Sequence, residues 1–133
     1  MCSCHKMSVR ADNHQQIRFL YQELQSTLIS KGYHCDYKSK PIKVKEYDAV
    51  DCYAVCLISP DSGAHTMVGK VTLYENERYG LIVIRPECPE DIIPLNSALG
   101  SALDKRADLI RTNPSARTRF DIVSDHPTYL HDD

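Results

Sequence analysis

The sequence predicts an α+β fold, a two-layer sandwich in which two helices pack on one face of a three- to four-stranded antiparallel sheet. Three observations support this prediction. Apolar residues recur at helical spacing near each end of the chain, runs typical of strands lie between them, and turn-forming residues separate the runs. Two amphipathic helices need an apolar surface to cover, and one face of a sheet supplies it. The expected order is α-β-β-β-(β)-α, followed by a polar tail.

The first helix is expected to begin near Asp12, which can cap it, with Gln15 as the partner in a capping box. Gly32 is expected to end it, because glycine accepts the left-handed backbone that closes a helix. The predicted buried stripe consists of Ile17, Leu20, Tyr21, Leu24 and Leu28. Residues 1–11 show no periodicity and are expected to form a flexible lead-in.

The strands are expected between residues 33 and 85. Residues 33–37 alternate as a half-buried strand does, and residues 50–58 are apolar on both faces, as in a central strand. Further strands are expected at 66–74 and 79–85, joined by a polar turn. The sheet face away from the helices is expected to carry Tyr53, Thr66, Lys70, Thr72 and Tyr74.

The second helix is expected to begin after Pro86 and to end at Asn113 and Pro114. Its predicted apolar face consists of Ile92, Leu95, Leu99, Leu103, Ala107 and Ile110. Residues 12–113 are therefore expected to form a single domain. Residues 114–133 are expected to be a partly ordered tail with a short strand at 119–123.

Composition narrows the class of protein. The formal net charge of -2 is unlike that of a dedicated, strongly basic nucleic-acid binder. The longest apolar run, residues 52–58, is far shorter than the roughly 20 residues of a membrane-spanning helix. Residues 1–10 contain no apolar signal-peptide core. We expect a cytoplasmic protein, in the host cytoplasm if it is viral, with its six cysteines reduced.

No catalytic motif occurs in the sequence: it has no glycine-rich phosphate loop, no H-E-x-x-H and no G-x-S-x-G. We therefore expect a non-catalytic binding protein without a cofactor, such as an adaptor, inhibitor or accessory factor of the kind that viruses and phages encode. It would dock a macromolecular partner, first of all a protein, through the exposed sheet face. The expected partner-binding residues are Tyr53, Tyr74, Tyr79 and Lys70, because tyrosine is favoured at interfaces.

Nucleic-acid binding, in particular RNA binding, is the first alternative. Four lysines fall within eight residues with no acid between them, and two arginines of the tail extend the set: Lys38, Lys40, Lys43, Lys45, Arg117 and Arg119. The α-β-β-β-α order resembles the double-stranded-RNA-binding domain, although that family begins its second helix with lysines and this chain has Pro89, Glu90 and Asp91. Lysines on an edge strand also prevent aggregation, and an edge near residues 33–45 would allow homodimer formation.

A small cysteine- or metal-dependent enzyme is the second alternative. Cys88 lies at a helix start, where a thiol pKa is lowered, and its base would be His34, His65 or His126. A restriction-endonuclease-like core would use Asp48 or Asp51 with Lys70, but Val68 stands where that family has its second acid.

Metal-ligand residue types occur in two terminal groups. Cys2, Cys4 and His5 lack a second ligand pair, and His126 and His131 lie in the polar tail. Cys52 and Cys56 lie about 13 Å apart if they are on one strand, too far to bind one ion together. They are expected to be buried, and no metal site is predicted.

Overall fold

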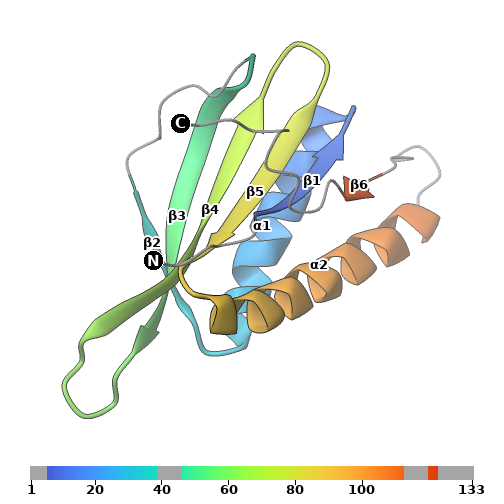
Figure 1. The fold of residues 1–133 in the computed structure, drawn as a ribbon. Coiled ribbons are helices and arrows are strands. Elements are labelled where there is room, and N and C mark those ends of the chain that lie inside the picture. Colours follow the sequence, from blue (N-terminus) through green and yellow to red (C-terminus); the bar gives the residue numbers. More distant parts are fainter. Residues whose placement is uncertain (1–5, 39–45, 113–119, 123–133) are drawn as a thin grey trace.

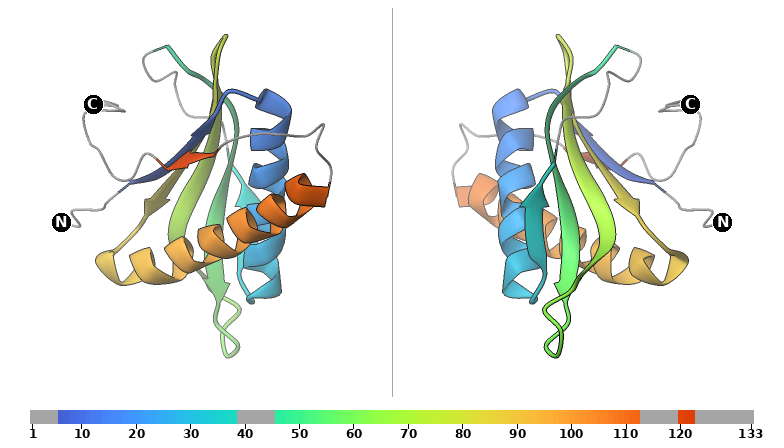
Figure 2. Two further views of the ribbon diagram at one scale, coloured as in Figure 1. Left: turned by 90° about the vertical axis from the view of Figure 1, so that its right-hand side faces the viewer. Right: turned by 90° about the vertical axis from the view of Figure 1, so that its left-hand side faces the viewer.

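The computed structural model describes residues 6–38, 46–112 and 120–122. The elements in chain order are β1 (Met7–Ala11), α1 (His14–Ser30), β2 (His34–Tyr37), β3 (Asp48–Ile58), β4 (His65–Glu75), β5 (Gly80–Pro86), the 3-10 turn η1 (Pro89–Asp91), α2 (Ile92–Thr112) and β6 (Asp121–Ile122). All strand pairs are antiparallel, and the sheet order is β2-β3-β4-β5-β1-β6 (Figure 1). Both helices lie on the same side of this sheet (Figure 2).

The predicted α+β class is confirmed, but the strand count and the element order differ from the prediction. Six strands form the sheet rather than three or four, and a strand precedes the first helix. The lead-in expected over residues 1–11 is therefore wrong for Met7–Ala11. This segment pairs with β5 along its whole length and with β6 on its other side. Strand β6 lies inside the short strand expected at 119–123.

Helix α1 has the predicted apolar stripe, and all five of its members are buried. The cap is Asn13 rather than Asp12: its side-chain oxygen accepts a 3.1 Å hydrogen bond from the backbone N–H of Gln16. Gly32 follows the last turn with a φ of 96°, the left-handed conformation expected of it.

Helix α2 packs beside α1 through its first half. Leu95, Ala98, Leu99 and Ala102 are buried in the same apolar cluster as the α1 stripe. Further along, Leu103 is half-buried and Ala107 is exposed, so the predicted apolar face extends further along the helix than its buried part does. Neither helix in the described part of the chain has the length and hydrophobicity needed to cross a membrane.

The sheet face away from the helices is not the exposed surface that the sequence predicted. Tyr47, Tyr74, Leu81 and Val83 form a second buried cluster there. Cys52, Cys56 and Thr72 are also buried, as expected for the two cysteines and contrary to expectation for the threonine. One largely exposed part of the sheet is the arm (residues 57–66), made of the end of β3, the turn and the start of β4. This arm projects beyond the helices (Figure 1).

Candidate metal centre

The predicted partner-binding residues do not share a surface. Tyr53 faces the helices, where its ring lies 5.1 Å from that of Tyr21, and Tyr74 belongs to the second cluster. Both side chains have an exposed fraction of 0%, so neither is placed to contact a partner. Tyr79 is half-buried, with the Arg10 guanidinium 4.6 Å from its ring centroid. Lys70 alone of the four is exposed.

Most of the other predicted site residues lie outside the described residues. These are Lys40, Lys43, Lys45, Arg117, Arg119, Cys2, Cys4, His5, His126 and His131. Lys38, directly after β2, is exposed. Cys88 precedes η1, and its backbone N–H donates a 3.2 Å hydrogen bond to Oδ2 of Asp91. His34 and His65, two of the three candidate bases for Cys88, both contact Asp36.

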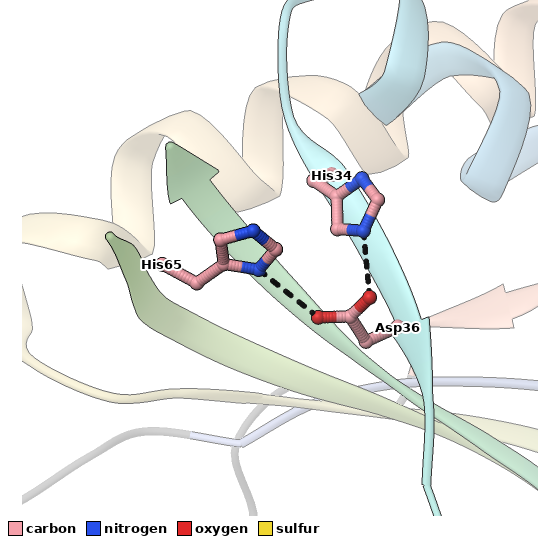
Figure 3. A group of neighbouring side chains, drawn as sticks. All are labelled: His34, Asp36 and His65. Carbon is pink, nitrogen blue, oxygen red and sulfur yellow. Dashed lines mark hydrogen bonds and ion pairs between the residues drawn. The ribbon is translucent and has the colours of Figure 1, made fainter. Parts of the chain in front are cut away.

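His34, Asp36 and His65 converge on one point at the edge of the sheet (Figure 3). The His34 Nε2 atom lies 2.6 Å from Oδ1 of Asp36, and the His65 Nδ1 atom lies 3.4 Å from Oδ2. The two imidazole rings meet edge to face, with centroids 5.0 Å apart. The potential ligand atoms of all three side chains lie within 4.8 Å of one another. Three metal-ligating side chains, two imidazoles and one carboxylate, therefore surround one small volume.

Strand register brings His65 next to Asp36, although the two residues are 29 positions apart in the sequence. His34 pairs with Cys56 and Asp36 pairs with Ala54 across the β2–β3 ladder, while His65 pairs with Ile58 across the β3–β4 ladder. Side chains two residues apart on a strand point to the same face. The three side chains consequently lie on the face away from the helices, where β2 meets the base of the arm. A register shift between Val55 and Cys56 lies in the same region.

The site is open to solvent and carries an ionised carboxylate. The exposed fractions of the His34, Asp36 and His65 side chains are 45%, 38% and 42%. Burial raises the pKa of Asp36, but hydrogen bonds from His65 and His34 outweigh it, so the pKa lies below its ordinary value. An ion can therefore reach the site, and the carboxylate that would bind it is charged at neutral pH.

Cys56 lies directly beside this group. Its thiol donates a weak 4.0 Å hydrogen bond to Oδ2 of Asp36, and its side chain is buried. Burial and, after it, the Asp36 charge raise the pKa of the thiol, while Lys38 lowers it. Without an ion, the sulfur is therefore a neutral thiol at physiological pH.

Among the described residues, no other set of three or more His, Cys, Asp or Glu side chains brings its ligand atoms this close. A hollow of about 770 Å³ at the other end of β3 and β4 is lined by the carboxylates Glu46, Asp48, Glu75 and Glu77. These carboxylates do not form such a set. Arg18 also donates two hydrogen bonds to Glu75. Among the described residues, the closest set of ligand atoms is therefore at the β2 edge and not in this hollow.

The sequence held a partial signal for this site. His34 and Asp36 are two residues apart in an alternating segment, so their side chains are expected on the same face of the strand. His65 could not be added without the register of β3 against both neighbours. The chain matches no protein-family model, no curated protein and no solved structure.

Proposed function

We propose that this chain is a binding protein without chemistry of its own, and that it binds a divalent transition-metal ion through His34, Asp36 and His65. The convergence of their ligand atoms within 4.8 Å carries the proposal. Two imidazoles and one carboxylate suit zinc, nickel, cobalt or copper. Calcium and magnesium prefer sets made of oxygen alone, so they are expected to bind weakly.

A purely structural role explains the group less well. Exposed ion pairs contribute little to stability, because water screens them and long side chains lose freedom when they pair. All three side chains are about 40% exposed, and their polar atoms point toward one another (Figure 3). A bound cation would be coordinated by the carboxylate and by one nitrogen of each imidazole. Metal binding therefore explains the convergence of the three side chains, which folding does not require.

The test is isothermal titration of the full chain with zinc, nickel, calcium and magnesium. Alanine variants of His34, Asp36 and His65 are compared with His14→Ala. His14 is a suitable control because it contacts the Asn76 carbonyl, beyond the far end of β4. Cys2 and Cys4 are changed to serine in every sample, so that these two thiols do not contribute to the measured binding. We expect one equivalent of zinc to be lost in each of the three variants and kept in the control. Unchanged stoichiometry and affinity in His65→Ala would contradict the proposal.

Docking of a protein partner, in the cytoplasm, is a second candidate function. It is favoured by the arm, where Leu57 and Ile58 have exposed fractions of 46% and 45% next to His65. Charged side chains at these two positions, in Leu57→Asp/Ile58→Asp, are expected to abolish capture of the partner from a nuclease-treated lysate. Asp104→Lys, an exposed position of α2 on the other side of the sheet, is the control.

If the captured species is instead nucleic acid that is released by higher salt, the alternative of RNA binding through Lys38 and its neighbouring lysines is supported.

A further inference from the structure

We infer that Cys56 is the fourth ligand of the metal site, so that His34, Asp36, His65 and Cys56 form a closed set for a zinc-class ion. The inference rests on the proposed function and adds to it the coordination number and the kind of ion. Three protein ligands with an open position are typical of catalytic zinc, whereas four ligands are typical of structural or storage sites. The identity of the fourth ligand therefore distinguishes a binding protein from a hydrolytic enzyme.

The position of Cys56 fits this role. It is the direct cross-strand partner of His34 and points to the same face as Asp36. Its sulfur lies 4.0 Å from Oδ2 of Asp36, although it is not within 4.8 Å of the ligand atoms of all three other residues. In a tetrahedral zinc site an oxygen at about 2.0 Å and a sulfur at about 2.3 Å from the ion lie about 3.5 Å apart. A side-chain adjustment of about half an ångström brings these two atoms to that separation. To complete the set, the imidazole side chains must also turn so that their ligand nitrogens approach the sulfur.

Burial differs between Cys56 and the other three residues in a way that suits a closed site. The side chain of Cys56 is 5% exposed, whereas the two histidines and the aspartate are open to solvent. An ion would therefore enter from solvent between the exposed groups and meet the thiol on the inner side. On binding, the S–H bond breaks, sulfur keeps the electron pair that it shares with the ion, and the proton passes to solvent.

The neighbouring cysteines are not placed to substitute for Cys56. Cys35 pairs with Val55 and packs against the helix-side core, which is the other face of the sheet. Cys52 is four residues along β3 and accepts a 3.3 Å hydrogen bond from the Thr72 hydroxyl. Among the described cysteines, Cys56 is thus the one on the correct face at the correct position along the strand.

Cobalt(II) is the probe, because a thiolate ligand gives cobalt a near-ultraviolet charge-transfer band that nitrogen and oxygen ligands do not give. The full chain, with Cys2 and Cys4 changed to serine, is titrated with cobalt and compared with Cys56→Ser, Cys56→Ala and the control Cys88→Ser. We expect the band in the parent protein and in the control. We expect it to be lost in both Cys56 variants, which should bind cobalt more than roughly tenfold more weakly.

The outcomes separate this inference from the proposed function. Cobalt binding without the band in the parent protein, a measurement that needs no Cys56 variant to fold, would overturn the role of Cys56 and leave the three-residue site standing. A band that persists in well-folded Cys56→Ser would assign the sulfur to another cysteine and would also overturn the inference. Absence of cobalt and zinc binding in the parent protein would overturn both proposals.

Discussion

The substitution Gly80→Ala tests how closely α1 packs on the sheet. A Cβ atom at Gly80, the first residue of β5, would lie 2.0 Å from Cγ2 of Ile17 and 3.0 Å from its Cβ. Two carbon atoms in contact need about 3.5 Å. The overlap of about 1.5 Å must be relieved by moving α1 or by forcing Ile17, which is fully buried, out of its rotamer.

The expected cost follows from this overlap. Overpacking a core costs about 1–3 kcal/mol, and a clash with a buried β-branched side chain belongs at the upper end. Replacing glycine by alanine inside a strand stabilises the folded state by about 0.5–1 kcal/mol, because alanine loses less backbone entropy on folding. We therefore expect Gly80→Ala to lower the free energy of unfolding by about 2 kcal/mol.

Urea denaturation followed by far-ultraviolet circular dichroism measures this change. Ile17→Ala alone should cost about 2–5 kcal/mol, because it leaves a cavity. The double variant should cost less than the sum, since the new methyl group occupies space that Ile17 gives up. Gly100→Ala is the matched control: nothing lies within 4 Å of its Cβ position in α2, so it should stabilise by about 0.5–1 kcal/mol. A Gly80→Ala protein as stable as the parent, or strictly additive effects in the double variant, would refute the packing argument.

Three further predictions follow from the core and the site. Zinc at about 100 times its dissociation constant should raise the free energy of unfolding by about 2.7 kcal/mol, seen as a higher Tm that His65→Ala abolishes. Tyr53→Phe should leave stability unchanged or raise it slightly, because the hydroxyl has no hydrogen-bond partner among the described residues, whereas Tyr53→Ala should cost about 3–5 kcal/mol. Burial, and to a smaller extent nearby Cys35 and Asp51, raises the pKa of Tyr53, so only the unfolded chain ionises it near pH 10. The free energy of unfolding should therefore fall as pH rises above about 10, and it should fall less in Tyr53→Phe. Urea denaturation at several pH values measures this free energy, and an equal fall with pH in the two proteins would contradict the prediction.

Local periodicity predicted the helices better than it predicted the sheet. The α1 stripe is recognisable from the sequence, because spacing along one helix decides which residues share a face. Strand β1 was missed because it has only five residues, with serine and arginine among them. Its burial comes from pairing with β5 and β6, which lie about 70 and 110 residues away. Such pairings are not visible in a local pattern.

The prediction of an exposed sheet face conflicted with an observation made from the same sequence. A strand that is apolar on both faces must be covered on both faces. In β3 the residues Cys52 to Cys56 are buried without interruption, which places Tyr53 and Ala54 on opposite faces with neither exposed. Tyr53 and Tyr74 were therefore core residues, and a candidate binding site had to be sought where the burial pattern of the sheet stops.

That boundary is where the candidate metal site lies. Burial ends in β3 after Cys56 and begins in β4 only after Met67, so the arm extends past the packed core. Polar side chains placed there do not disturb the core, and they remain accessible to an ion. His34 and Asp36 come from the edge strand and His65 from the arm, with β3 between them. An ion bound by all three would join β2 to β4 across β3, and binding would therefore hold the base of the arm to the edge of the sheet. Because this link involves few core contacts, losing the ion should loosen the arm before it unfolds the domain.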